Sequence, residues 1–267
     1  RAVFIGGGTP TVLSGTQLAD IIAALKNNLP LQNPEITIEC NISNASEEKL
    51  QMLCEAGVTR ISTGVQTFNQ KLRYTLGLRH TINTILRWIN MVKKYPFRDL
   101  SIDLLFGLPG QTVKDFEQDL HTALSLPIDH ISVYKLAVFA YVKLYKELER
   151  GSVPALPEEA QLFEMFSAAQ ELQDKNYILE SAQEYCLPDH KTKFWQLTYD
   201  GYGDNLSFGA SSFGYVNGIS YQNIIDPADY IRATNEGTLP IQMVSHKITP
   251  QQLMERALTL GFRRGTV

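Results

Sequence analysis

The composition of the chain is that of a globular protein and excludes several broad classes. Its 267 residues, 44% hydrophobic and 19% charged, suffice for one large core, or for one core with a smaller domain beside it. Twenty-eight acidic and 24 basic residues give a net charge of -4, the wrong sign for binding nucleic acid through an overall positive field. No apolar run approaches the length of a membrane span and no leader pattern is visible, so we expect a cytoplasmic protein without an integral membrane segment.

The cysteines do not have the spacing of a metal site. Cys40, Cys54 and Cys186 are odd in number and lie far apart, without a C-x-x-C or similar cluster. This pattern disfavours a disulfide framework and a zinc site, and thiols buried in a core are the more ordinary alternative. We therefore assign no metal-ligating residue to the sequence.

The chain begins with a short apolar strand, Ala2 to Ile5, followed by three glycines, Thr9 and Pro10. Glycines directly after a strand indicate a sharp turn or a close approach of the backbone to a ligand. Neither of the two phosphate-binding glycine motifs fits, because no further spaced glycine and no lysine follows. A ligand contact and a plain turn both remain open from these residues alone.

Strand and helix patterns alternate up to residue 139. Strands are expected at Ala2 to Ile5, Glu35 to Cys40, Arg60 to Val65, within 99–110, and at His130 to Phe139. Helices are expected at Thr16 to Asn28, from a cap at Asn44 to Gly57, within 69–94, and from Val113 to Leu126 with Thr112 as the N-cap. This alternation predicts a parallel sheet with helical crossovers, either an open sheet or part of a (β/α) barrel.

The ends of the strands favour the barrel. Polar or glycine residues follow or end the first four strands, at Gly6 to Thr9, Glu39, Gln66 and Asp103, and Ala140 follows the fifth. An open sheet gathers its ligand residues mainly on two strands, whereas a barrel brings all strand ends to one mouth. Asp103 lies between two apolar residues, so its carboxylate is expected to be buried against a partner.

The pattern changes after Tyr141. A helix is expected from about Pro157 to Asp174, followed by an aromatic and glycine-rich stretch at 195–223 and by helices at about Pro227 to Asn235 and Pro250 to Leu260. We take residues from about 145 to 267 as a second, smaller layer that caps or extends the barrel.

Several motifs together carry a family resemblance. In order along the chain they read "FIGGGTPTVLS", "ITIECNIS", "GVTRISTGVQTFNQ", "SIDLLFGLPGQT", "FGASSFGYVNGISYQN" and "MERALTLGFRRG". Their order and separations closely resemble the radical S-adenosylmethionine family of oxygen-independent coproporphyrinogen III oxidases and haem chaperones, over nearly the whole chain.

The resemblance implies a fold and a domain division. The fold would be a partial six-stranded (β/α) barrel whose first strand lies upstream of Arg1, with residues 1–144 as barrel and 145–267 as a C-terminal extension truncated at its end. In the family, the loop after that first strand bears a C-x-x-x-C-x-x-C run that holds a [4Fe-4S] cluster. The sequence has no such run, and none of its three cysteines can replace it.

The resemblance also implies which residues bind S-adenosylmethionine. Gly6, Gly7, Gly8 and Thr9 would receive the methionyl ammonium, because only glycines let backbone carbonyls approach it closely. Glu39 would bind ribose hydroxyls or the ammonium, the alternative being a salt bridge inside the barrel mouth. The other candidate residues are Gln66, Asp103, Ala140, Ala210 beside the adenine, and Arg79, although Leu78 stands where the family has its arginine.

The implied chemistry is reductive cleavage of S-adenosylmethionine, with an electron donor such as flavodoxin or ferredoxin and a porphyrin or haem as the second ligand. The family includes coproporphyrinogen oxidases, haem chaperones and anaerobic haem-degrading methyltransferases. The segments "LGFRRG" and "GYVNGISYQN" resemble the chaperones, whereas "YKLAVFA" with "ERGSVPALPEEAQLFEMF" resembles the haem-degrading proteins. We rank the chaperone first, and the sequence assigns no catalytic residue.

Two other functions remain possible from the residues. One is a haem carrier without enzymatic activity, whose axial ligand would be one of His80, His121, His130, His190 and His246. The other is a barrel enzyme acting on a phosphorylated metabolite, which would need a glycine-rich phosphate site near the last strands. No such site is evident.

Overall fold

The structure, a computed structural model, describes residues 1–181, 183–199 and 203–264. It forms two compact units, Arg1–Lys193 and Phe194–Val267, each of which is described by itself. The expected division of the family's domains after residue 144 stays a prediction. Within the described residues, no helix is both long and apolar enough to cross a membrane.

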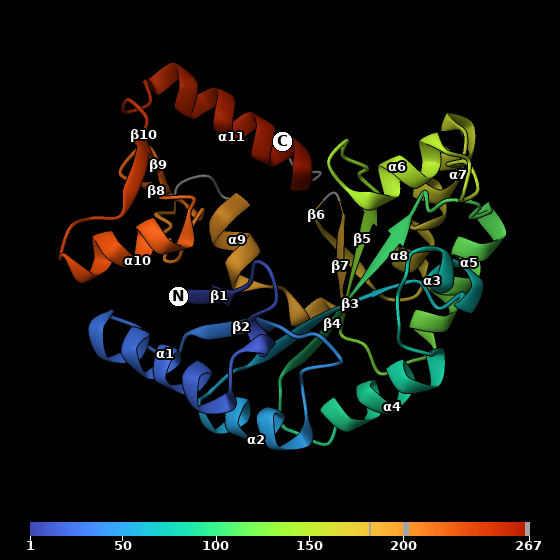
Figure 1. The fold of residues 1–267 in the computed structure, drawn as a ribbon, viewed down its shortest axis with the longest axis horizontal. Helices are drawn as coiled ribbons and strands as arrows, with labels where there is room; N and C mark the ends of the chain where they lie inside the picture. The colour runs from blue at the N-terminus through green and yellow to red at the C-terminus, as the bar shows by residue number, and fades with distance from the viewer. Residues whose placement is uncertain (182, 200–202, 265–267) are drawn as a thin grey trace. The chain divides into compact units, whose positions relative to one another are not determined.

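The first unit is built on a curled seven-stranded sheet with the strand order β1-β2-β3-β4-β5-β7-β6. Strands β1 to β5 run parallel and match the five expected strands, whereas β7 pairs antiparallel with both β5 and β6. Figure 1 shows the sheet fanning out with α1, α2 and α4 along its convex side. The strands are β1 Ala2–Ile5, β2 Glu35–Glu39, β3 Arg60–Gln66, β4 Asp99–Phe106, β5 His130–Lys135, β6 Ile178–Ser181 and β7 Glu184–Cys186.

Helices α1 to α5 of this unit begin at side chains that cap their free N–H groups. Ser14 and Gln17 form a capping box at α1, and Thr112 with Asp115 forms another at α5. The expected cap at Asn44 is wrong: Ser46 caps α2. The helical segments are η1 Pro10–Val12, α1 Gly15–Asn28, α2 Glu47–Glu55, α3 Gln70–Thr75, α4 Ile82–Val92, α5 Val113–Leu124, α6 Lys143–Glu149, α7 Glu159–Ala168, α8 Glu171–Asp174 and η2 Pro188–His190.

Alternation along the strands separates an apolar face from a polar one. The apolar face packs against the helices and forms the core, with Ile38, Ile61 and Ile102 among its fully buried side chains. The opposite face of β2 to β5 carries polar side chains, and many of these are also buried: Glu35, Thr37, Arg60, Ser62, Asp99, Ser101, His130 and Ser132. Such a polar inner face needs internal hydrogen bonds or a ligand to compensate for lost water.

The hairpin of β6 and β7 was not expected from the sequence. Its strands have four and three residues, and they carry Glu180 and Glu184, which are unusual in buried strands. Both carboxylates are satisfied by partners on other segments: Glu180 accepts from the Thr192 N–H at 2.6 Å and Glu184 from the Ser132 hydroxyl at 2.6 Å. The hairpin therefore completes the polar inner face rather than the core.

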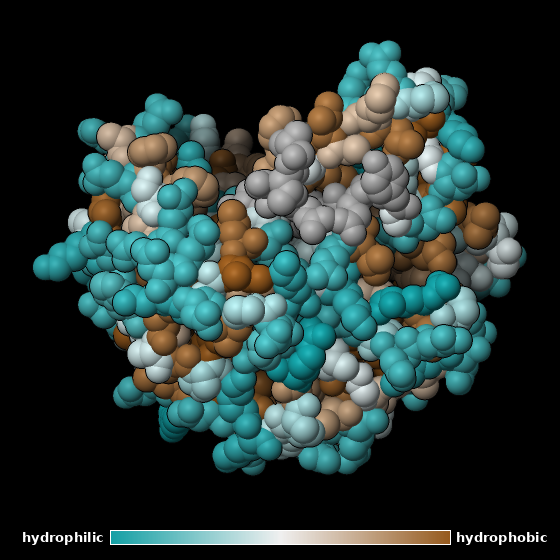
Figure 2. Space-filling view, turned by 180° about the vertical axis from the view of Figure 1, so that it is seen from behind, coloured by the Kyte–Doolittle hydropathy of each residue, from teal (hydrophilic) through white to brown (hydrophobic). Residues whose placement is uncertain are grey.

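The second unit contains a three-stranded antiparallel sheet with the order β10-β9-β8. The helix expected at Pro227 to Asn235 is found at those bounds, and the last helix extends further than expected. Figure 2, a view of the whole chain from behind, shows mainly hydrophilic side chains, with apolar ones in separate patches. The elements are α9 Lys193–Tyr199, β8 Phe213–Val216, β9 Ile219–Asn223, α10 Pro227–Asn235, β10 Ile241–Val244 and α11 Pro250–Arg264.

Candidate functional site

The carboxyl ends of β1 to β4 bring together four of the segments singled out in the sequence. The Gly7 N–H donates to Glu39 Oε2 at 3.1 Å, which joins the ends of β1 and β2. Asp103 pairs in register with Gly64 of β3, and Gln66 ends that strand. The carboxylates of Glu39 and Asp103 are close enough for Glu39 to raise the pKa of Asp103. Gly6 to Gly8, Glu39, Gln66 and Asp103 thus form one edge of the polar face.

The glycines after β1 leave space at this edge. A Cβ on Gly6 would lie 2.8 Å from the Glu39 carboxyl carbon, so that position is closed. Gly7 and Gly8 have φ values of +76° and +55°, which side-chain-bearing residues rarely adopt, and a Cβ on either would meet nothing within 4 Å. The backbone there is exposed and open to a ligand, while Thr9 leads into η1 as its N-cap residue.

Glu39 is a half-buried carboxylate at the end of β2. Burial raises its pKa, and the hydrogen bond from the Gly7 N–H opposes that shift. Among the described residues, no cationic side chain lies within 4.0 Å of the Glu39 carboxylate, so the salt bridge considered as an alternative from the sequence is not present there. A carboxylate of this kind is suited to hydroxyl donors or to a cationic ligand.

Gln66 has a strained backbone at the end of β3. Its φ is +72°, and the pairing of β3 with β4 shifts between Gly64 and Gln66. The side-chain amide lies over Gly64, where an added Cβ would be 2.5 Å from Nε2. Backbone strain of this kind costs about 1–3 kcal/mol and concentrates at functional sites.

Asp103 is partly exposed on the inner face of β4. Burial is the main cause that raises its pKa to about 6, the Ser132 hydroxyl and Arg60 lower it, and Glu39 raises it further. The neighbouring polar group on the inner face is Ser132, which pairs with Asp103 in the register of β4 and β5. Such a carboxyl changes charge easily near neutral pH when a cation approaches.

The other three candidates belong to other segments of the chain. Arg79 is exposed in the connection between α3 and α4, and Ala140 is exposed beyond Lys135, where β5 ends. Ala210 belongs to the second unit, in a turn before β8. Their roles in cofactor binding stay predictions.

Arg73 is a buried arginine that sequence reasoning missed. Its guanidinium donates to the carbonyls of Val65 and Thr67, at 2.5 and 2.8 Å, and to that of His80 at 2.8 Å. These bonds fix the backbone on both sides of Gln66. Arg73 lies one helical turn beyond Asn69, the N-cap of α3. Its position in the first turns of a helix that follows a strand was the feature of the sequence that could have indicated it.

A second missed group lines the inner face next to Asp103. Glu184 accepts hydrogen bonds from Ser132 and Tyr134, and His130 lies between Ser101 and Glu180 at 3.2 Å from each. The alternation of polar residues in "HISVYK" was the signal for one face of β5, but nothing nearby in the sequence pointed to Glu184.

The residues that the structure describes fit S-adenosylmethionine but not an iron-sulfur cluster. The open glycine edge and the carboxylates of Glu39 and Asp103 suit a ligand that carries an ammonium, a sulfonium and ribose hydroxyls. By contrast, Cys40 and Cys186 are buried thiols whose pKa burial raises to about 12, and the described residues contain no group of three metal-ligating side chains. Cluster ligands are therefore not among them.

The histidines considered as haem ligands differ in availability. His130 is fully buried, His190 Nδ1 bonds Asp99 at 2.5 Å, and His80 Nε2 bonds Ser43 at 2.7 Å. His121 and His246 are exposed. A histidine bonded through one ring nitrogen can ligate iron through the other, so all except His130, whose two ring nitrogens are both bonded, remain as candidates for the haem-carrier function.

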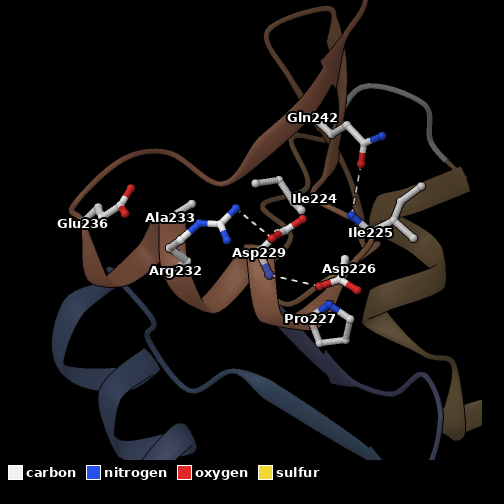
Figure 3. Close-up of a pocket in the computed structure, with 9 residues that line it drawn as sticks. All are labelled: Ile224, Ile225, Asp226, Pro227, Asp229, Arg232, Ala233, Glu236 and Gln242. Carbon is white, nitrogen blue, oxygen red and sulfur yellow. Dashed lines mark hydrogen bonds and ion pairs between the residues drawn. The ribbon is translucent and has the colours of Figure 1, made fainter.

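A hollow of about 730 Å³ lies in the second unit beside α10. Figure 3 shows most of its polar side chains already paired: Arg232 with Asp229 at 2.8 Å, Asp226 with N–H groups at the start of α10, and Gln242 with the Ile225 N–H. Because these groups serve the unit itself, the strand edge of the first unit is the better candidate site.

Comparison with known proteins identifies the family of the chain. The Radical SAM superfamily model matches residues 1–123, which include all four segments of the strand edge. The chain is 32% identical to the heme chaperone HemW of Bacillus subtilis over 99% of its length and 70% of that protein. It is 30% identical to the anaerobilin synthase of Escherichia coli O157:H7, over 91% of its length and 55% of that protein.

A solved structure supports the fold. The coproporphyrinogen III oxidase HemN of Escherichia coli, a radical SAM enzyme, superposes with a TM-score of 0.86 at 22% identity over 98% of this chain. The chain spans 63% of that protein. The fold and its strand edge define a radical SAM half-barrel. Within that class, the chain belongs to the HemN/HemW family.

Proposed function

We propose that the strand edge of the first unit binds S-adenosylmethionine for a radical reaction of haem or porphyrin metabolism. The observation that carries the proposal is the pair of carboxylates, Glu39 and Asp103, beside an open glycine edge on neighbouring strands. The carboxyl ends of barrel strands are where such folds build their sites. The superfamily match to residues 1–123 supports the choice of ligand.

The chain's own residues would hold the cofactor in place. The backbone at Gly7 and Gly8 would accept the methionyl ammonium, and Glu39 and Asp103 would balance positive charge or accept from ribose hydroxyls. Gln66 would offer a donor and an acceptor from the end of β3. When bound, S-adenosylmethionine supplies the radical chemistry of the superfamily, and the polar face orients it and limits access of water.

We rank haem delivery by a chaperone first as the biological role. The similarity to the heme chaperone HemW of Bacillus subtilis covers 70% of that protein and supports this ranking. The similarity to an anaerobilin synthase supports anaerobic haem breakdown as the second candidate, and oxidation of coproporphyrinogen III is a third candidate within the same family. An electron donor such as flavodoxin or ferredoxin belongs to each enzymatic alternative.

One anaerobic experiment separates these roles. The full-length protein, reconstituted with its iron-sulfur cluster, is incubated with S-adenosylmethionine, a reductant and either haem or coproporphyrinogen III, and the tetrapyrroles are identified by chromatography and mass. A chaperone returns haem unchanged in a protein complex. Loss of the haem absorbance with a methylated linear product indicates breakdown, and loss of carboxyl groups from coproporphyrinogen III indicates the oxidase. Haem binding that Asp103→Asn leaves intact, with no cofactor cleavage by either protein, would favour a plain carrier.

A further inference from the structure

Gln66 is the central residue of a rare turn at the end of β3. The Thr67 N–H donates to the Val65 carbonyl at 3.0 Å, across Gln66 alone, and the φ of Gln66 is +72°. A hydrogen bond of this span around a residue with positive φ defines the strained form of the γ-turn. Without support from neighbouring groups, a glutamine would relax out of this conformation.

Arg73, which is buried, provides that support. One guanidinium nitrogen, Nη1, donates to both carbonyls that flank Gln66, at 2.5 Å to Val65 and 2.8 Å to Thr67. A second nitrogen, Nε, donates to the His80 carbonyl at 2.8 Å and anchors the guanidinium to the connection between α3 and α4. Hydrogen bonds from a charged donor are about twice as strong as neutral ones, so these bonds offset the strain of the turn.

A second charged side chain holds the same short segment. Asp119 accepts from the Phe68 N–H at 2.7 Å, and its charge raises the pKa of Arg73, which burial lowers. Burying a guanidinium is costly unless hydrogen bonds and a nearby opposite charge compensate for the lost water. Here both kinds of compensation come from the chain at 65–68 and from the carboxylate beside it, so the buried charge is directed at this turn.

The turn places the Gln66 amide over β3, next to the carboxylate edge. Its Nε2 lies where a Cβ on Gly64 would be 2.5 Å away, and Gly64 pairs in register with Asp103. The pairing of β3 with β4 shifts between Gly64 and Gln66, at the same point as the turn. The direction of the amide therefore depends on the backbone conformation that Arg73 holds.

We propose, building on the proposed function, that Arg73 is a positioning residue for S-adenosylmethionine, which keeps Gln66 in the turn and its amide directed at the ligand. Arg73 acts through the two carbonyls and not through contact with the ligand. An arginine that only stabilised the fold would, when removed, lower the melting temperature and leave the affinity of the folded protein unchanged. An arginine that acts through Gln66 lowers the affinity, and its loss does not add to the loss of the Gln66 amide.

The test is a double-mutant cycle in the full-length protein, reconstituted with its iron-sulfur cluster. Anaerobic calorimetry measures the affinity for S-adenosylmethionine, and thermal melting measures stability, in the wild type, Arg73→Met, Gln66→Gly and the double variant. Methionine keeps much of the apolar bulk of arginine without its donors. We expect the affinity to be about tenfold lower in each single variant. In the double variant it should again be about tenfold lower, and not about a hundredfold.

Two further variants make the result specific. Tyr177→Phe removes a buried hydrogen bond of 2.5 Å to the Ile128 carbonyl, which lies before β5 and away from the carboxyl end of β3. It should melt earlier than the wild type and bind with the same affinity. Arg73→Lys keeps a charged donor but lacks the fork that reaches the turn and the His80 carbonyl together, so it should lose less affinity than Arg73→Met. It takes the place of Arg73→Met in the cycle if that variant does not fold.

The outcomes distinguish this inference from the function on which it rests. Wild-type protein that binds no S-adenosylmethionine would overturn the proposed function and this inference with it. If the wild type binds, unchanged affinity in Arg73→Met or in Gln66→Gly, or losses that add in the double variant, would overturn the role of Arg73 alone. An equal loss of affinity in Tyr177→Phe would do the same, because a general loss of stability would then account for both.

Discussion

The Gly7 N–H donates to the Glu39 carboxylate at 3.1 Å and thereby fixes the loop after β1 to the end of β2. The bond uses one carboxylate oxygen and leaves the backbone at Gly7 and Gly8 facing open space. The loop is therefore held in place by the site that it helps to form.

A valine at Gly7 is expected to remove cofactor binding with limited loss of stability. The new Cβ meets no protein atom within 4 Å, so the side chain would occupy the space of the ligand. The positive φ adds strain of about 1–3 kcal/mol. Calorimetric binding and thermal melting of the same sample measure both effects. Gly237→Val, at a similar φ with equally open surroundings, is the matched control and should keep the affinity.

If Gly7→Val binds S-adenosylmethionine normally and only melts earlier, the glycines after β1 form a turn and not a ligand contact.

Gln66→Gly should separate strain from function. Glycine tolerates the φ of +72° at no steric cost, so the free energy of unfolding should stay equal or rise by about 1 kcal/mol. Removal of the amide should nevertheless lower the affinity for S-adenosylmethionine by about tenfold. Equal affinity in the variant would show that the amide of Gln66 does not contact the cofactor.

Asp103→Ala is expected to reduce both stability and affinity, in contrast to Gln66→Ala, which should mainly reduce affinity. The alanine removes one of the two carboxyl groups that pair in register with Ser132 on the inner face, at about 1–3 kcal/mol of unfolding free energy. Urea unfolding alongside binding compares the two. Equal loss of stability in both variants contradicts the assignment of Asp103.

The strand edge could be predicted from the sequence because it depends on local patterns. Glu39 and Asp103 end or interrupt apolar strands, and parallel strands bring their carboxyl ends to one side. Glu184 could not be found in this way, because its partners Ser132 and Tyr134 lie about fifty residues earlier and β7 has only three residues. The expected strand to Phe139 was too long, because β5 ends at Lys135, where its pairing with β4 stops.

Asp119 should make the free energy of unfolding fall as the pH rises. Burial raises its pKa from 3.8 to about 6, although it accepts from the Phe68 N–H at 2.7 Å. A raised pKa means that the folded state favours the neutral acid, so stability is greatest below about pH 4 and is lost between about pH 4 and 6. Asp119→Asn cannot ionise, so relative to wild type it should gain about 2–3 kcal/mol across this range. The free energies of unfolding of the two proteins are measured by denaturant titration at pH 4 and at pH 7. The same difference between the two proteins at both pH values would contradict this.

The 267-residue chain should not assemble a four-iron cluster by itself. Cys40 and Cys186 are buried with raised pKa values, and the described residues offer no group of three ligands. Anaerobic reconstitution followed by iron and sulfide analysis should give well below four irons per chain. A near-stoichiometric four-iron content would show that ligands had been missed.

The most direct test of the account is anaerobic calorimetry of S-adenosylmethionine with the wild-type protein and with Asp103→Asn at pH 7.5. The account predicts one binding event per chain in the wild type and an affinity about tenfold or more lower in the variant, because the amide cannot balance the charge of the ligand. Absence of binding in the wild type, or equal affinity in both proteins, would contradict the proposal that the strand edge of Glu39 and Asp103 is the cofactor site.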